Sequence, residues 1–328
     1  MNDVTFQGIE FDVETNEETG SAVVLSLTSR TCNDEELWKE MPSLEKMTKL
    51  KQVDLYRNRY ILSLHESVTT LERLTLLSLK RCSNLEELPP SLGNLKSLKV
   101  LDLTDCVSLS CLPDSIGELQ CLETLNLGSL HSSGNKTLKV LPESLGNMSN
   151  LQELILEKCK ALESIPDSIG GLEVLRELQM RECKCVTKLP YSIGKCKSLV
   201  EMGLSKCISL TVLPDSIGNL KMLEDLIMTK CKSLVELPEE IEGCEKLVNL
   251  DLRGCKKLVK LPDTVGALTT LRHLHLSTCK SLKQLPSSLN NLTAVEGIYV
   301  DGCIALEELP ISLQEGEIKS KVIGWQGF

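Results

Sequence analysis

The stretch from Leu213 to Leu237, LPDSIGNLKMLEDLIMTKCKSLVEL, contains the unit that is repeated along most of the chain. Each copy has Leu-Pro, a Ser-Ile-Gly-like turn and the pattern L-x-x-L-x-L-x-x-C, and the next Leu-Pro follows 24 residues later. The repeated prolines are Pro89, Pro113, Pro142, Pro166, Pro190, Pro214, Pro238, Pro262, Pro286 and Pro310. Only the interval from Pro113 to Pro142 departs from this spacing, because these prolines are 29 residues apart. The repeat between them therefore contains an insertion, which falls in the region 131–139.

A period of this length with this pattern is typical of leucine-rich repeats, in which each unit is one short strand and a return segment. The alternation around Leu226 and Met228 predicts a strand with these side chains facing inward and Asp225, Ile227 and Thr229 facing outward. One repeat cannot bury its own leucines, so successive repeats stack and pair their strands in parallel. The sequence predicts an α/β solenoid, a leucine-rich repeat horseshoe with a parallel β-sheet on the concave face and short 3₁₀ or irregular segments on the convex face.

The return half of the unit is constrained by its proline. Pro214 lacks a backbone N–H, which excludes a regular helix interior or a central strand at this point. Ile217, Leu220 and Leu223 are spaced by three residues, which predicts a short 3₁₀-like turn. Glycine recurs after the isoleucine, and we expect it to adopt a positive φ. This slot holds Gly117, Gly146, Gly170, Gly194, Gly218 and Gly266.

Residues 1–40 match the repeat weakly and are predicted to form an N-terminal cap. Within them, Ala22–Thr28 (AVVLSLT) is predicted to be the first core strand. Glu35–Met41 is predicted to be a short helix that carries Trp38 onto the end of the solenoid, because terminal repeats must shield the core.

Residues 41–312 are predicted to be the repeat array, and 313–328 a C-terminal cap in which Trp325 and Phe328 cover the last repeat. The core of a repeat array grows linearly with its length, so we expect one domain despite the 328 residues.

A net charge of −10 and an isoelectric point near 5.1 argue against nucleic acid or an anionic membrane as the main partner. No apolar run approaches 18 residues, so no membrane span is expected. The N-terminus lacks the basic start and apolar stretch of a secretory signal, which predicts a cytoplasmic protein, and we expect a monomer. The N-x-[ST] sequons at Asn135, Asn147 and Asn291 are therefore interpreted as chance occurrences.

A cysteine ends the L-x-x-L-x-L-x-x-C pattern in most repeats. This slot holds Cys82, Cys106, Cys159, Cys183, Cys207, Cys231, Cys255, Cys279 and Cys303. Asn58 occupies it in the first repeat, and Leu130 is the exception beside the insertion. A thiol or an asparagine can hydrogen-bond the turning backbone, which favours a structural ladder. Disulfides and a metal site are the alternatives, and the odd total of 15 cysteines favours free thiols.

Motifs of catalysis are missing from the sequence: it has no G-x-x-x-x-G-K-[ST], no G-x-S-x-G and no H-E-x-x-H. We therefore expect no catalytic residues, no cofactor and no resident metal. The outward strand positions are the candidate functional residues, because a concave parallel sheet displays one column of side chains for each position.

Two charged columns stand out at these positions. The outward residue that begins each strand is acidic in four consecutive repeats, at Glu153, Glu177, Glu201 and Asp225, and then becomes Asn249 and His273. The residue after the cysteine is basic at Lys160, Lys184, Lys232, Lys256 and Lys280. Either the two columns form a solvated face whose charges partly neutralise each other, or the acidic column is an electrostatic docking surface for a protein partner.

His273-x-His275 places two imidazoles on the exposed face, beside Asp251 of the preceding repeat and Tyr299 of the following one. Such a set could ligate zinc, but a polar surface patch is the favoured interpretation. Tyr299 and Tyr56 supply contact area with a polar tip and are better candidates for partner binding. The polar insertion from Gly128 to Lys139 is predicted to be an exposed loop.

The unit LPDSIGxLxxLxxLxLxxC, as in Leu112–Cys121, Ile165–Cys183 and Leu213–Cys231, resembles the leucine-rich repeats of plant intracellular immune receptors of the nucleotide-binding class. The resemblance covers residues 41–312 and implies a domain that recognises a pathogen effector or a guarded host protein, or that contacts other domains of the same receptor. The chain also resembles the plant Ras-group leucine-rich repeat proteins, which implies, as an alternative, a stand-alone intracellular scaffold of a signalling protein.

Overall fold

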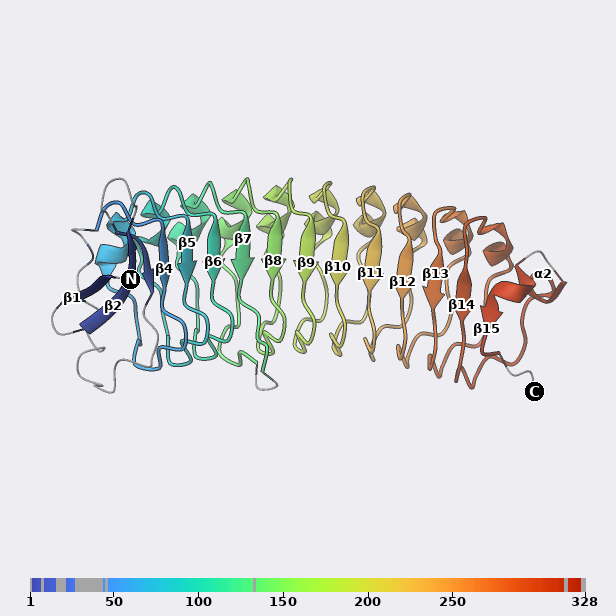
Figure 1. Ribbon diagram of the computed structural model, residues 1–328. Coiled ribbons are helices and arrows are strands. Elements are labelled where there is room, and N and C mark those ends of the chain that lie inside the picture. The colour runs from blue at the N-terminus through green and yellow to red at the C-terminus, as the bar shows by residue number, and fades with distance from the viewer. Residues whose placement is uncertain are drawn as a thin grey trace. The chain divides into compact units, whose positions relative to one another are not determined.

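The computed structural model describes residues 2–6, 9–15, 22–26, 44, 47–131, 134–315 and 318–325. The chain divides into two compact units, Met1–Ala161 and Leu162–Phe328. In each unit, short strands follow one another in chain order, and single turns of 3₁₀ helix lie behind them (Figure 1). The fold is a leucine-rich repeat solenoid with a parallel sheet on one face and 3₁₀ segments on the other, as the 24-residue period predicts.

The first unit begins with two antiparallel strand pairs, β1 with β2 and β2 with β3, and continues with parallel pairs from β3 onward. Its strands are β1 (Asn2–Phe6), β2 (Ile9–Thr15), β3 (Ala22–Ser26), β4 (Gln52–Asp54), β5 (Leu76–Ser78), β6 (Val100–Asp102), β7 (Thr124–Asn126) and β8 (Glu153–Ile155). Its 3₁₀ segments are η1 (Glu66–Thr70), η2 (Leu92–Asn94), η3 (Asp114–Glu118) and η4 (Glu143–Asn147). The strand predicted in Ala22–Thr28 is present as β3, whereas Glu35–Met41 and Trp38 lie outside the described residues.

The second unit contains parallel strands and the described C-terminal elements. Its strands are β9 (Glu177–Gln179), β10 (Glu201–Gly203), β11 (Asp225–Ile227), β12 (Asn249–Asp251), β13 (His273–His275), β14 (Gly297–Tyr299) and β15 (Val322–Ile323). Its helical segments are η5 (Asp167–Gly171), η6 (Tyr191–Lys195), η7 (Asp215–Asn219), η8 (Glu239–Gly243), η9 (Asp263–Ala267), η10 (Ser287–Asn291), α2 (Ile311–Glu315) and η11 (Lys319–Lys321). No helix within the described part of the chain has the length and hydropathy that a bilayer crossing requires.

The predicted strand alternation is confirmed. Leu226 and Met228 are fully buried, while Asp225 and Ile227 on the same strand are only half-buried. Each repeat contributes the same inward positions, so the leucines of successive repeats form a continuous aliphatic core within each unit. Pro214 has the extended conformation that precedes η7, which confirms the predicted 3₁₀ turn.

The prediction of a positive φ for the recurring glycine is wrong, because in this slot the glycine provides clearance. A Cβ atom on Gly194 would lie 2.3 Å from the carbonyl oxygen of Ser216, and one on Gly218 would lie 2.0 Å from that of Glu240. Both distances are far shorter than a carbon–oxygen contact, so any side chain would force adjacent 3₁₀ segments apart. At Gly194 and Gly218 the missing side chain therefore lets successive repeats stack closely.

The segment predicted as the C-terminal cap adds one more strand. Val322 and Ile323 of β15 pair in parallel with Ile298 and Tyr299 of β14, 24 residues earlier. Trp325 is half-buried, and Phe328 lies outside the described residues. The parallel ladder thus continues beyond the last recognisable Leu-Pro unit.

Candidate functional site

The acidic column predicted from the sequence lies on the exposed face of the sheet. In the second unit, Glu201 pairs in register with Glu177 on one side and with Asp225 on the other. Asn249 and His273 continue the column on β12 and β13. Glu153 occupies the same position at the start of β8 in the first unit. Three carboxylates of the second unit therefore stand on adjacent strands, which lie about 5 Å apart in a sheet.

Uncharged amide and hydroxyl groups donate hydrogen bonds to carboxylates of this column. Gln179 Nε2 donates to Glu201 Oε1 at 2.6 Å, and Asn249 Nδ2 donates to Asp225 Oδ1. In the first unit, Thr124 Oγ1 donates to Glu153 Oε2 at 3.2 Å. These hydrogen bonds satisfy carboxylate oxygens but leave their negative charge in place, so the face keeps an acidic character.

Asp251 lies two residues after Asn249, at the end of β12, and its carboxylate forms an ion pair with Arg253. Arg253 Nη2 lies 2.5 Å from Asp251 Oδ2, and Arg253 Nε lies 3.0 Å from both carboxylate oxygens. Burial alone would raise the pKa of Asp251, but the hydrogen bonds and charge of Arg253 outweigh it and hold the pKa below its ordinary value. The carboxylate that a zinc site would need is thus engaged by a guanidinium. No cluster of three metal-ligating side chains occurs among the residues that the structure describes.

His275 and Tyr299 form an aromatic stack beside this ion pair. Their ring centroids are 4.4 Å apart with an interplanar angle of 13°, and the ring of His273 lies 6.1 Å from that of His275. Gly297 makes room for the tyrosine, because a Cβ atom there would lie 2.7 Å from the ring. Burial lowers the pKa of His275, which favours its neutral form. The strands β13 and β14 therefore present a flat aromatic surface to solvent, with a polar edge.

The cysteines of the ladder turn their thiols toward the preceding repeat. Cys231 Sγ donates to Leu204 O at 3.0 Å, and Cys82 Sγ donates to Leu55 O at 3.2 Å. The same bond is made by Cys106, Cys159, Cys207, Cys255, Cys279 and Cys303. Cys183 is buried at the equivalent position. Burial raises the pKa of Cys82 and of Cys207 to about 12, so these thiols stay protonated and are poor nucleophiles and metal ligands.

A second pair of buried thiols was missed by the sequence analysis. Cys196 and Cys244 follow η6 and η8, and their sulfur atoms donate to Ile169 O and Ile217 O, each at 3.3 Å. Their spacing of 48 residues, two repeat periods, was the available signal. They occupy the position that Leu220 holds in its repeat.

Asn135, and not Leu130, occupies the cysteine slot of the repeat with the insertion. Leu130 is 59% exposed, whereas Asn135 is buried and its Nδ2 donates to Cys106 O and Leu109 O at 3.1 and 2.9 Å. Its Oδ1 accepts from the backbone N–H of Leu138, which is also buried. The prediction of one exposed loop over Gly128–Lys139 is therefore wrong at Asn135 and Leu138, because the slot moved with the inserted residues. Glycosylation of Asn135 would break these bonds.

The residue before the slot has a left-handed backbone in both units. This position is occupied by Arg57, Arg81, Asp105, Gly134, Lys158, Glu182, Lys206, Lys230, Gly254, Thr278 and Gly302, all with φ between 60° and 72°. At most of these positions the N–H donates to a carbonyl of the next repeat, as from Arg81 to Thr104 and from Lys206 to Thr229, both at 2.7 Å. The inter-repeat ladder therefore extends past the end of each strand, and the side chains at this position gather in the turns.

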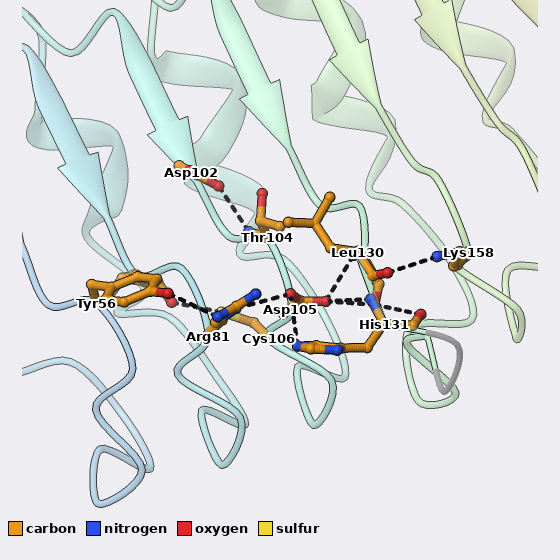
Figure 2. A network of polar contacts seen from close by, with 11 residues as sticks. Tyr56, Arg81, Asp102, Thr104, Asp105, Cys106, Leu130, His131 and Lys158 are labelled. Atoms are coloured by element: carbon orange, nitrogen blue, oxygen red, sulfur yellow. Dashed lines mark hydrogen bonds and ion pairs between the residues drawn. The ribbon is translucent and has the colours of Figure 1, made fainter. Parts of the chain in front are cut away.

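Three of these turns and the insertion meet around Asp105 in the first unit (Figure 2). Asp105 Oδ1 accepts from Ser129 Oγ at 2.6 Å and from the backbone N–H groups of Leu130 and His131 at 2.9 and 3.3 Å. Its Oδ2 lies 3.5 Å from Arg81 Nε and 3.6 Å from His131 Nε2. Its side chain is only 2% exposed. Asp105 therefore fastens the inserted loop to the solenoid and faces two basic groups.

Arg81 is held from its other side by Tyr56. Arg81 Nη1 donates to the Tyr56 hydroxyl at 2.8 Å, and its guanidinium carbon lies 5.7 Å from the centre of that ring (Figure 2). A cavity of about 580 Å³ opens at this place, lined by Arg57, Arg59, Arg81, Ser83, Asn84, Asp105, Val107 and His131. The repeat pattern does not predict this cavity. Arg57 and Arg81, one repeat period apart, were the visible signal.

No protein-family model and no curated protein sequence matches the chain. Solved structures of leucine-rich repeat proteins do match its fold. The Arabidopsis receptor kinase HAESA, in complex with the peptide hormone IDA and the co-receptor SERK1, is 22% identical with a TM-score of 0.52, and the match covers 90% of this chain and 54% of that one. A TDR receptor is 20% identical with a TM-score of 0.56, covering 77% of this chain and 43% of that one. A leucine-rich repeat protein of Leptospira interrogans is 23% identical with a TM-score of 0.41, covering 91% and 88%.

Proposed function

We propose that the chain is a non-catalytic protein-interaction module that binds a partner through the exposed face of its sheet. The observation that carries the proposal is the pair of carboxylates Glu201 and Asp225, which stand in register on adjacent strands and accept hydrogen bonds from the neutral side chains Gln179 and Asn249. Adjacent like charges destabilise a sheet, so a face that retains them is suited to a partner of opposite charge. The fold supports the proposal, because HAESA was solved with a peptide hormone and a co-receptor.

More specifically, we propose a cytoplasmic recognition domain of plant innate immunity, whose partner is a pathogen effector, a guarded host protein or another domain of the same receptor. The resemblance of the LPDSIG unit supports this role. A stand-alone scaffold of a signalling protein is the alternative that the second resemblance supports.

Charge reversal on the sheet face tests the binding surface. Glu201→Lys with Asp225→Lys should leave the fold intact, because both side chains are half-exposed, and should weaken capture of the partner from source-tissue extract. The matched control is Glu239→Lys with Glu240→Lys, which makes the same charge change on the exposed 3₁₀ segment η8. Proteins retained by the control and lost by the sheet variant support the proposal. Equal capture by both variants would contradict it.

The size of the native polypeptide distinguishes the two cellular roles. An antibody against the inserted loop should detect a species well above 36.3 kDa if the chain acts within a larger receptor. A single band near 36.3 kDa would instead favour the stand-alone scaffold.

A further inference from the structure

We infer that the cavity around Arg81 in the first unit binds a phosphate group carried by a ligand, at a site separate from the sheet-face column. Arg57, Arg59 and Arg81 line the cavity together with His131. Arginine stays protonated at every physiological pH, so the cavity holds three permanent positive charges. They are concentrated in one place on a chain whose net charge is −10. The cluster is positive although the chain as a whole is negative, and it therefore favours binding of an anionic ligand at this place.

The carboxylate of Asp105 does not cancel this charge. Its Oδ1 is saturated by Ser129 Oγ and two backbone N–H groups, and its Oδ2 lies between Arg81 and His131 (Figure 2). Asp105 also lines the cavity, but its side chain is only 2% exposed, compared with 30% for the side chain of Arg81. One buried negative charge against three arginines leaves a cationic excess. Asp105 is thus a positioning residue for Arg81 and the inserted loop.

The Arg81 guanidinium is fixed before any ligand arrives. Tyr56 accepts a hydrogen bond from its Nη1 and offers a ring face 5.7 Å from its central carbon, while Asp105 Oδ2 forms an ion pair with its Nε at 3.5 Å, without a hydrogen bond. A restrained side chain loses little conformational entropy on binding, which increases affinity. Its remaining N–H groups stay available as donors, because two anchors cannot use all five.

A phosphate suits this cavity better than a carboxylate does. A phosphomonoester carries about 1.5 to 2 negative charges and three strong acceptor oxygens, which matches several guanidinium forks. Ser83 and Asn84 also line the cavity, so the Ser83 hydroxyl and the second N–H of the Asn84 amide, whose first N–H donates to Arg59 O at 2.8 Å, are neutral donors. The volume of about 580 Å³ also lies in the range of sites for small organic ligands, so the cavity can take more than the phosphate itself. The phosphate could come from a phosphorylated side chain of a protein or from a small phosphorylated metabolite.

Calorimetric titration of the full chain at low ionic strength tests the site. The probes are inorganic phosphate, pyrophosphate and N-acetyl-phosphoserine amide, at neutral pH. We expect saturable binding of at least one probe, and a loss of about tenfold or more in affinity for Arg59→Gln and for Arg57→Gln, because each removes a charged donor. Both residues are exposed, so their replacement leaves the fold intact. The matched control is Arg73→Gln, an exposed arginine of the same unit that does not line the cavity.

The outcomes separate the site from its ligand source. Tighter binding of the phosphoserine amide than of pyrophosphate assigns a phosphorylated protein, and the reverse order assigns a small phosphorylated metabolite. Absence of binding of all three probes at millimolar concentration would overturn the inference, as would an equal loss of affinity in Arg73→Gln. Because these probes do not involve the sheet face, failure here leaves the proposed docking role standing, and failure of partner capture leaves this site standing.

Discussion

The residue before each cysteine slot has a left-handed backbone, although most of these positions hold a residue other than glycine. For an L-amino acid this conformation costs roughly 1–2 kcal/mol, because the Cβ atom crowds the following carbonyl. Thr278 has a φ of 62° and a β-branched side chain. Because this side chain is exposed, its packing contacts offset little of the backbone strain. The N–H of Thr278 bonds to Asp301 O at 2.6 Å, which explains why the conformation persists.

Thr278→Gly should therefore stabilise the protein. Glycine removes the steric cost of the left-handed backbone. It also raises the conformational entropy of the unfolded chain, which destabilises the folded state by about 0.5–1 kcal/mol. The net result is an increase of roughly 0.5–1 kcal/mol in the free energy of unfolding. Urea denaturation followed by circular dichroism measures it. Lys280→Gly is the control, an exposed neighbour whose φ is not positive, and it should be neutral or destabilising. A stability loss in Thr278→Gly equal to that of the control would show that the left-handed position is not strained.

Asp105 is the residue on which the inserted loop depends. Asp105→Ala should lower the free energy of unfolding by about 2–4 kcal/mol, because it leaves the N–H groups of Leu130 and His131 without their acceptor and Ser129 Oγ with only the carbonyl oxygen of His131, at 3.3 Å. Asp105→Asn keeps one acceptor oxygen and tolerates the left-handed backbone, so its loss should be smaller. Equal losses in the two variants would show that the charge, and not the hydrogen-bond acceptor, holds the loop.

The contribution of Asp105 should also depend on pH. Burial alone would raise the pKa of Asp105, but the hydrogen bonds from Ser129, His131 and Leu130 and the charge of His131 outweigh it and hold the pKa below its ordinary value of 3.8. A depressed folded-state pKa contributes stability above the unfolded value, and that stability disappears as pH falls through the folded value. The difference between wild type and Asp105→Asn should accordingly be largest above about pH 4 and shrink in more acidic solution.

The 3₁₀ segments depend on a glycine that acts by leaving space. Gly194→Ala would place a Cβ atom 2.3 Å from Ser216 O and 2.7 Å from Ser216 Cβ, so η6 and η7 would have to separate. We expect a loss of about 1–3 kcal/mol in the free energy of unfolding, although alanine is the better helix former. Lys195→Ala, in the exposed last position of the same segment, should be nearly neutral. A neutral Gly194→Ala variant would mean that the stacked segments can move apart without cost.

The strands and 3₁₀ turns could be predicted because every repeat meets the same environment, and a regular spacing of Leu226, Pro214 and their equivalents therefore predicts both register and burial. The clearance role of Gly194 could not be predicted, since it depends on the distance between neighbouring repeats, which no pattern within one repeat encodes. Asn135 was missed because the inserted residues moved the slot along the chain. The Asp105 network was missed because its members come from three repeats and an insertion, and only side-chain geometry brings them together.

At the scale of the whole chain, the sheet face and the cavity carry charges of opposite sign. The sheet face of the second unit displays Glu177, Glu201 and Asp225, and the cavity of the first unit is lined by arginines. Both surfaces are exposed to solvent, where salt screens charges over about 8–10 Å, so association at either should weaken as ionic strength rises. A chain of net charge −10 with a local cationic cavity is therefore suited to more than one kind of partner.

Repeat arrays bury their leucines against immediate neighbours only, and the effect of a core cavity should therefore be local. Leu101 in the first unit and Leu250 in the second are both fully buried at the same strand position, and either change to alanine should cost about 2–5 kcal/mol. Hydrogen exchange followed by mass spectrometry should show lost protection centred on the mutated repeat and its neighbours, with little change in the other unit. Leu101→Ala and Leu250→Ala are each other's controls. A uniform loss of protection along the chain in both variants would instead mean that the repeats unfold as one cooperative body, and nearest-neighbour stacking would then be an incomplete account of what stabilises the fold.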